Sequence, residues 1–197
     1  MIDYIKGEIT ELNPTYAVLE TGGIGYFINI SLPAYSTLNG QKNAKLFVYE
    51  VIREDAHSLF GFLQPADRQL FLMLISVSGI GANTARMIMS SYSAPEIQQM
   101  IATENAVALS SIKGIGAKTA QRIIVDLKDK ILKLNIATTG TENLLLQVSN
   151  ETRDEAVSAL IMLGFAANIS QKAVDSILKA QPEIKVEQLI KLALKSI

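Results

Sequence analysis

Val77-Ser-Gly-Ile-Gly-Ala-Asn-Thr-Ala85 is repeated further along the chain as Ile112-Lys-Gly-Ile-Gly-Ala-Lys-Thr-Ala120. Each copy follows a short apolar run and is followed by residues with helical apolar spacing. Because glycine lacks a Cβ, Gly-x-Gly allows a turn that would strain other residues. Each copy therefore predicts a hairpin that leads directly into the start of a helix, and together they predict tandem helix-hairpin-helix units.

The start of a helix offers unpaired backbone N–H groups and the positive end of the helix dipole, and both suit a phosphate. Two such sites in one small module indicate a grip on adjacent phosphates of a nucleic-acid backbone. The predicted DNA-binding residues are Gly79, Ile80, Gly81, Asn83, Lys113, Gly114, Ile115, Gly116, Lys118, Thr119 and Arg122.

Other glycine motifs fit the sequence less well. A single Gly-x-Gly before a helix is often only a steric feature of a helix–helix turn, so the duplication carries the prediction. A dinucleotide-binding turn has a third glycine where this chain has Thr84 and Thr119. The Gly-x-x-x-x-Gly-Lys-Ser/Thr pattern of a nucleotide phosphate loop is absent from the sequence.

Positive charge is concentrated around the hairpins. The formal net charge is −1 overall, but residues 65–133 carry eight basic and five acidic side chains, whereas the segments before and after them are net acidic. Lys118 and Arg122 lie four residues apart on one face of the predicted helix, and we assign both to phosphate contact. The lysines at 128–133 are interpreted as a solvated helix face.

Composition predicts a soluble, cytoplasmic protein without a membrane segment. The 197-residue chain is 49% hydrophobic and 19% charged, which allows a buried core and excludes global disorder. It has no cysteine for a disulfide or a thiolate metal site, as is typical of a reducing cytosol. We expect no signal peptide at the N-terminus, and no apolar run approaches the ~20 residues of a membrane helix.

Residues 1–64 alternate in the manner of β-strands. The alternating runs span residues 2–9, 16–20, 25–30, 46–52 and 58–62, and turn residues separate them. Five or six short strands in so short a segment predict a small closed barrel of the OB type. Glu54 and Asp55 fall between the last two runs and are predicted at an exposed hairpin tip, where acidic residues ordinarily serve solubility.

Residues 65–135 are predicted to be all-α. The expected helices span 66–77, 82–91, 94–102, 104–111 and 117–134. Ser93 and Thr103 are predicted N-caps, with Glu96 completing a capping box after Ser93. Residues 136–150 are predicted to form a flexible linker, although Leu144-Leu-Leu interrupts it and marks either a helix start or a docking contact.

Residues 151–197 predict a three-helix bundle of the UBA-like type, a kind of module that usually binds other proteins. The expected helices span 152–163, 170–180 and 183–196. The predicted core consists of Ala156, Leu160, Val174, Ile177, Leu189 and Leu192. Leu163 and Phe165 lie at a helix corner and are predicted partner-binding residues, with burial in the core as the alternative.

The sequence offers little for enzymatic chemistry. His57 is the single histidine, so we expect a surface residue rather than a histidine metal cluster or a Ser-His-Asp triad. Glu54 and Asp55 are adjacent, which points their side chains apart on a strand. We therefore predict no catalytic residue, no metal and no cofactor, and a protein that serves another subunit.

Several segments in order along the chain carry a family resemblance. They are the barrel start Met-Ile-x-x-x-x-Gly, Val51-Ile-Arg-Glu-Asp-Ala, Leu59-Phe-Gly-Phe62, the two Gly-Ile-Gly hairpins, Ala120-Gln-Arg-Ile-Ile-Val-Asp-Leu-Lys128 and Glu155-Ala-Val-x-Ala-Leu…Leu-Gly-Phe165. In this combination the chain resembles the RuvA family, the bacterial Holliday junction branch migration subunits. The resemblance covers the whole chain, and its motifs are specific jointly rather than singly.

The resemblance implies binding of four-way DNA junctions and recruitment of the hexameric ATPase RuvB for branch migration in recombination and repair. It implies a homotetramer on the junction, or two tetramers enclosing it, with the RuvC resolvase as a further partner and ATP hydrolysis left to RuvB. It also changes the interpretation of Glu54 and Asp55, which match the acidic pin of the family. Leu163 and Phe165 lie in the part that resembles the RuvB-contacting domain.

Two positions depart from the family pattern, since Asn83 and Ala117 stand where many members have lysine. Fewer cations weaken the salt-dependent part of DNA affinity, and Lys113 and Arg86 are candidates to compensate. Two hypotheses of other classes are a protein-interaction adaptor whose barrel and hairpins only pack, and an accessory subunit of a repair nuclease.

Overall fold

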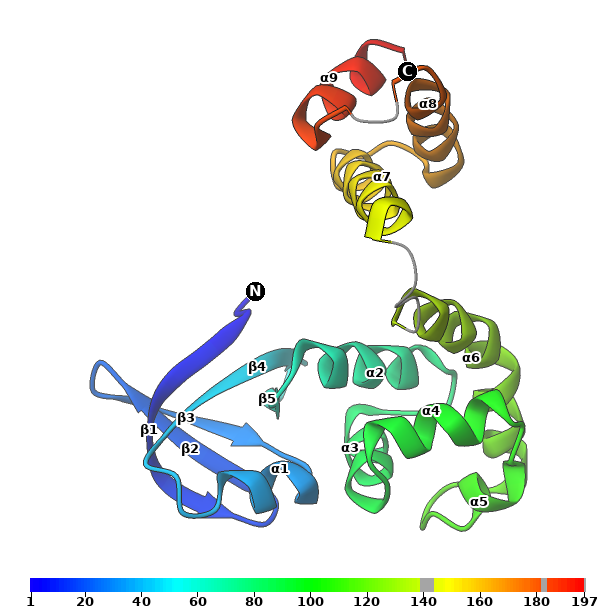
Figure 1. Cartoon of the computed structure of the whole chain (residues 1–197). Helices are drawn as coiled ribbons and strands as arrows, with labels where there is room; N and C mark the ends of the chain where they lie inside the picture. The colour runs from blue at the N-terminus through cyan, green and yellow to red at the C-terminus, as the bar shows by residue number, and fades with distance from the viewer. Residues whose placement is uncertain (139–143, 182–183, 197) are drawn as a thin grey trace. The chain divides into compact units, whose positions relative to one another are not determined.

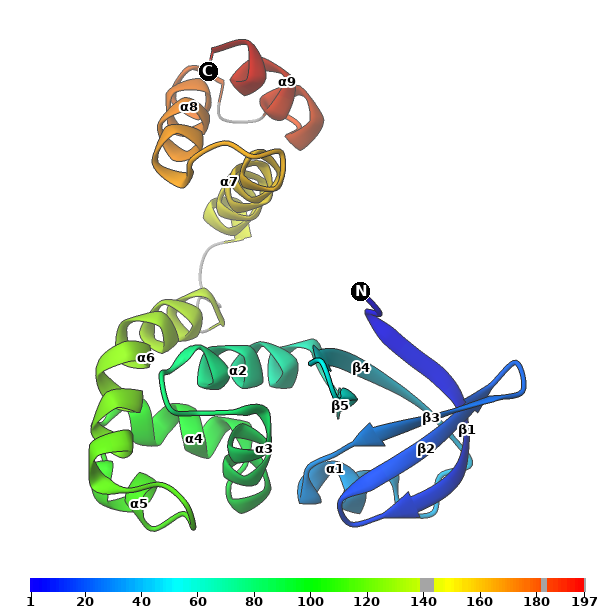
Figure 2. The same ribbon diagram turned by 180° about the vertical axis from the view of Figure 1, so that it is seen from behind.

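The computed structural model describes residues 1–138, 144–181 and 184–196. The chain divides into two compact units, Met1–Leu134 and Asn135–Ile197. The first unit contains a barrel and a set of helices (Figures 1 and 2), and the second contains three helices packed around their own core.

The N-terminal strands close into a five-stranded barrel, which confirms the predicted fold. The strands are β1 (Tyr4–Asn13), β2 (Tyr16–Thr21), β3 (Ile24–Asn29), β4 (Asn43–Ile52) and β5 (His57–Phe62). Their order around the barrel is β1-β2-β3-β5-β4, with β3 and β5 parallel and the other pairs antiparallel. Alternate residues of each strand point inward, so side chains such as Leu19, Ile28 and Leu46 fill the interior.

A short helix, α1 (Leu32–Leu38), connects β3 to β4 and was not expected from the sequence. Pro33 lies in its first turn, where proline is tolerated. Ala34 and Leu38 are buried against the barrel core, one helical turn apart. Two apolar residues at this spacing indicate a helix, but the strand-like alternation on either side obscures the signal.

Five helices follow the barrel: α2 (Pro65–Ser76), α3 (Ala82–Ser91), α4 (Ala94–Ala102), α5 (Ala106–Ser110) and α6 (Ala117–Thr138). They share a core with the outer face of β5, because Phe71 of α2 packs against Phe60 and Phe62 at ring-centroid distances of 5.4 and 4.9 Å. Figure 1 shows α2 leading from β5 across α3 and α4. The hairpins are thus carried by helices that are fixed to the barrel.

The chain between α4 and α5 differs from the prediction. The capping box at Ser93 is confirmed, since the Glu96 carboxylate accepts a 2.7 Å hydrogen bond from the Ser93 N–H. Thr103, however, ends α4 instead of starting the next helix, and Glu104 has a φ of 57°. This left-handed conformation interrupts the helix, and Asn105 becomes the N-cap of α5 by accepting from the Ala108 N–H.

The second unit is the predicted three-helix bundle, built from α7 (Leu144–Met162), α8 (Ala167–Ala180) and α9 (Val186–Ser196). Where burial is described in this unit, the buried residues are Ala156, Val157, Leu160, Ser170, Val174, Leu189 and Ala193. Ile177 is partly buried, but the prediction of Leu192 as a core residue is wrong, because its side chain is 37% exposed. Ala193, the next residue, is buried instead, so the inward face of α9 continues from Leu189 with a spacing of four residues where three were expected.

The predicted linker 136–150 is largely helical at its ends. Helix α6 continues to Thr138 and α7 begins at Leu144, so Leu144-Leu-Leu marks a helix start, as one of the two alternatives proposed. The remainder of the predicted linker, 139–143, and the predicted helix start at Glu183 lie outside the described residues. Among the helices that the structure describes, none combines the length and hydrophobicity that a membrane crossing requires.

Candidate nucleic-acid interface

The first hairpin is a tight turn that is stabilised by a buried side chain and a backbone hydrogen bond. Gly79 has a φ of 93°, a left-handed conformation in which a Cβ is strained. Ile80 is buried, and its N–H donates to the Val77 carbonyl at 3.0 Å. Helix α3 begins immediately afterwards, with Ala85 donating to the Gly81 carbonyl at 2.9 Å.

The second hairpin repeats this arrangement residue for residue. Gly114 has a φ of 88°, and buried Ile115 donates its N–H to the Ile112 carbonyl at 2.9 Å. Ala120 then donates to the Gly116 carbonyl at 2.9 Å, which places Gly116 at the start of α6. Ile80 and Ile115, both predicted to bind DNA, are therefore internal anchors whose side chains and N–H groups are engaged within the protein.

The second glycine of each hairpin is not required by the protein's own packing. Gly81 has a φ of −89° and a ψ of 171°, an extended backbone that other residues adopt readily. A Cβ at Gly81 or at Gly116 would meet no atom within 4 Å. Gly81 precedes α3 without a side-chain cap, and neither α3 nor α6 has an acidic residue in its first turn. The start of α3 thus leaves its first amides open to an outside acceptor, and the start of α6 has open space at Gly116 where a side chain would stand.

The side chains around these helix starts are polar or cationic. Lys113, Lys118 and Asn83 are exposed, and Thr119 is half-buried. Arg122 is exposed as well, and its Nη1 donates to the Ser78 carbonyl of the first hairpin at 3.2 Å. The residues assigned to DNA binding are therefore brought together from two separate hairpins onto one compact unit.

Arg86 is partly buried and contacts the barrel. Its Nη1 donates to the Thr15 carbonyl at 2.8 Å, and burial lowers the pKa of its guanidinium. Together with the Leu32 N–H, which donates to Ser90 Oγ at 3.2 Å, this hydrogen bond attaches α3 to the barrel. Of the two candidates to compensate for Asn83, the exposed Lys113 is therefore favoured over Arg86.

Glu54 and Asp55 lie at the exposed tip of the β4–β5 hairpin, as predicted. The turn is closed by the Arg53 N–H, which donates to the Ala56 carbonyl at 2.8 Å. The base of this turn shares one cleft with the start of α3, lined among others by Arg53, Ala56, Ser58, Gly81, Ala82 and Asn83. The acidic tip and the first hairpin are consequently neighbours on the surface.

His57 is a surface residue, as predicted, with 55% of its side chain exposed. Its Nε2 lies 3.2 Å from Oε2 of Glu50 on the facing strand. Glu50 also accepts a hydrogen bond from the Ile2 N–H, and these contacts lower the pKa of its carboxyl group, the backbone N–H most of all. Glu50 thereby fastens the N-terminal residues to the barrel near the acidic turn.

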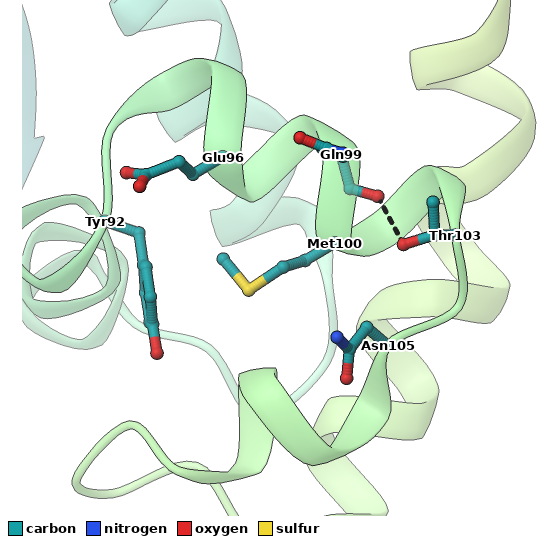
Figure 3. Close-up of a pocket in the computed structure, with 6 residues that line it drawn as sticks. All are labelled: Tyr92, Glu96, Gln99, Met100, Thr103 and Asn105. Carbon is teal, nitrogen blue, oxygen red and sulfur yellow. Dashed lines mark hydrogen bonds between the residues drawn. The ribbon is translucent and has the colours of Figure 1, made fainter.

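A second depression lies beside α4 (Figure 3) and is lined by Tyr92, Glu96, Gln99, Met100, Thr103 and Asn105. It contains none of the predicted DNA-binding residues. Hydrogen bonds from Ser93 lower the pKa of Glu96, which keeps this lining carboxylate charged. A negative charge there disfavours a phosphate, so this depression is not part of the candidate interface.

The helix corner in the second unit separates the two residues predicted to bind a partner. Leu163 is 60% exposed, whereas Phe165 is half-buried against the bundle core, where Ala156 and Leu160 lie. The structure adds Met162, which is 86% exposed at the end of α7 and was not singled out from the sequence. Gly164, with a φ of 98°, turns the chain between these residues.

A closed OB-type barrel, two helix-hairpin-helix units with open helix starts and a separate three-helix bundle define a modular nucleic-acid-binding class of protein. Three family models match the chain in succession: RuvA N terminal domain over residues 1–61, SAM-like Helix-hairpin-helix tandem over residues 71–129, and RuvA, C-terminal domain over residues 151–197. The chain belongs to the RuvA family.

Several similar proteins have the name Holliday junction branch migration complex subunit RuvA. Those of Bacteroides fragilis and Bacteroides thetaiotaomicron are 56% and 55% identical to this chain, over 99% of each sequence. That of Christiangramia forsetii is 45% identical over the full length of both sequences. The family resemblance inferred from the motifs is thereby confirmed.

Proposed function

We propose that this chain binds four-way DNA junctions through their sugar–phosphate backbone and recruits a RuvB-type ATPase for branch migration. The observation that carries the proposal is the pair of open helix starts at Gly81 and Gly116, where nothing inside the protein requires a glycine. A missing side chain at such a position lets another backbone approach closely. Lys113 and Lys118 supply positive charge beside the second of these starts.

Recognition of a junction would come from shape and not from base sequence. Amides and lysines contact phosphates, which position a protein on DNA but carry no sequence information. Glu54 and Asp55, beside the first hairpin, would repel phosphates and keep the strands apart at the crossover. We infer that these carboxylates guide strands and add no affinity.

The three-helix bundle is the proposed contact for the motor. Leu163 and Met162 expose apolar surface at the end of α7, which suits a protein partner. Phe165 supports this corner from the core side. In this division of labour the barrel at 1–64 and the hairpins at 65–135 hold the junction, the ATPase hydrolyses ATP, and the chain itself catalyses no reaction.

The proposed assembly is a homotetramer on the junction, with an octamer and the RuvC resolvase as further members of the complex. A four-way junction has four arms, and four copies would present one pair of hairpins to each arm. The full-length similarity to proteins named as branch migration complex subunits supports membership of a complex with other subunits.

The deciding experiment compares binding of a four-way junction with binding of a linear duplex of the same sequence, at several salt concentrations. We expect tighter binding of the junction, and an affinity for both that falls with salt. Equal, salt-insensitive binding to both would favour the protein-interaction adaptor. Incubation of the junction with Mg²⁺ and no partner tests the nuclease alternative, because cleaved strands would contradict a non-catalytic subunit.

A further inference from the structure

Met87 and Arg122 occupy equivalent positions in the repeated segment, since each lies five residues beyond the alanine that begins α3 or α6. Both reach across to the other hairpin. Arg122 Nη1 donates to the Ser78 carbonyl at 3.2 Å, and the methyl group of Met87 lies 3.7 Å from where a Cβ on Gly114 would stand. The Arg122–Ser78 hydrogen bond therefore joins the two hairpins, and Met87 lies beside the second hairpin at the matching position of the repeat.

We propose that Arg122 is a positioning residue that couples the two hairpins and orients the first of them for phosphate binding. The proposal rests on the proposed function and gives a different role to a residue that the sequence assigns to phosphate contact. From the first hairpin's helix, the methyl group of Met87 approaches Gly114 of the second hairpin. The hydrogen bond from Arg122 to Ser78 is therefore the polar connection between the two hairpins.

Peptide geometry explains how Arg122 would act. The Ser78 carbonyl and the Gly79 N–H belong to one planar trans peptide, so they point to opposite sides of it. A carbonyl directed at Arg122 therefore directs the Gly79 N–H away from Arg122, on the exposed turn. The charged donor also polarises the peptide, which strengthens that N–H as a donor, and it covers a carbonyl oxygen that would repel phosphate.

The contact can be observed directly in the free protein. Ser78-Gly79 is the sole Ser-Gly pair in the sequence. Full-length protein labelled with ¹³C at serine carbonyls and ¹⁵N at glycine therefore gives a single correlated carbonyl–nitrogen signal, from this peptide. We expect Arg122→Gln and Arg122→Lys to shift that signal, because lysine is one bond too short to replace Nη1. Lys130→Gln, which removes a charge from an exposed position of α6, is the matched control and should leave it in place.

Junction binding by the same variants distinguishes positioning from phosphate contact. We expect both Arg122 variants to lose affinity about tenfold, the scale of one charge-assisted hydrogen bond, with the slope of log affinity against log salt unchanged. If Arg122 contacts phosphate instead, Arg122→Lys keeps its affinity and Arg122→Gln flattens the slope by about one unit for each contact that the assembly loses.

An unmoved Ser78–Gly79 signal, or the pattern expected for phosphate contact, would overturn the proposal. Circular dichroism establishes that each variant is folded, and Arg122→Lys keeps the proposal falsifiable if Arg122→Gln is not. The two proposals fail separately. Absence of junction preference in the unmodified protein contradicts the proposed function, whereas the peptide signal reports on the coupling without any DNA.

Discussion

The two glycines of each hairpin are present for different physical reasons. Gly79 and Gly114 have positive φ values, so their role is conformational and belongs to the fold. Gly81 is extended, and neither it nor Gly116 has an atom within reach of an added Cβ. We therefore propose that they serve the approach of DNA, and single substitutions should separate stability from binding.

Gly81→Ala is expected to leave the melting temperature nearly unchanged while lowering junction affinity, because the added methyl group meets only the bound backbone. Gly79→Ala should instead destabilise the fold by about 1–2 kcal/mol, the cost of a left-handed residue with a Cβ. Thermal unfolding by circular dichroism and junction titration measure the two effects. A Gly81→Ala variant with full affinity would contradict close approach at this glycine.

Lys118→Glu tests charge at the second helix start. The exposed ammonium lies in the first turn of α6, so reversing its charge should lower junction affinity and flatten the dependence of affinity on salt. Lys130→Glu makes the same change further along the exposed face of α6 and serves as the control. The assignment of Lys118 to a phosphate is rejected if both variants show the unmodified slope.

At the scale of elements, the β4–β5 hairpin is distinguished by its acidic tip, which lies beside the first hairpin. The tip residues do not belong to the barrel core. Glu54→Lys is expected to leave junction binding intact or tighter, because a repulsive charge is removed, and to alter strand exchange driven by the motor. Glu20→Lys changes the same charge on β2 and provides the comparison. Weaker junction binding by Glu54→Lys would contradict a guiding role.

The second unit has an ion pair that ties α7 to α8. Arg153 donates from Nε and from Nη2 to the two carboxylate oxygens of Asp175, at 2.6 and 3.1 Å, and this hydrogen bonding lowers the pKa of Asp175. Both side chains are partly exposed, so the pair stabilises the bundle by at most about 1 kcal/mol.

Arg153→Gln should accordingly raise hydrogen exchange of the α8 amides by up to about fivefold at neutral pH. Because the pKa of Asp175 is lowered on folding, the stabilisation is complete above its ordinary value near 3.8 and is lost as pH falls through the lowered folded value. The difference between variant and unmodified protein should therefore persist down to about that pH and shrink only below it. A difference that already vanishes between pH 7 and 5 would contradict this assignment.

Helices and turns were predictable from the sequence where their ends have clear local signals. Helices α3 and α4 were predicted to the residue, because glycine, serine and proline mark their starts. The interruption at Glu104 was missed, since its left-handed conformation has no sequence signal in a residue that is neither glycine nor asparagine. At the site, the exposed lysines were identified, but the burial of Ile80 and the bond from Arg86 to the barrel depend on tertiary packing.

At the scale of the whole molecule, the proposed tetramer is the prediction with the widest consequences. Light scattering of the free protein should give four times the mass of one chain, and addition of junction DNA should show whether one or two such assemblies bind. A single-chain mass both with and without junction would contradict the proposed arrangement. Dilution before measurement controls for concentration-dependent association.

The cleft shared by the acidic turn and the start of α3 has a mechanical consequence under the proposed function. Arg86 and Ser90 attach α3 to the barrel, so the grip on the backbone and the carboxylates belong to one stiff block. In a duplex drawn through the complex, the strands would then separate at a constant distance from the hairpins that hold the backbone. That distance would be the same for every base sequence. Because this spacing does not depend on base sequence, the junction would migrate at a uniform rate along heterologous DNA.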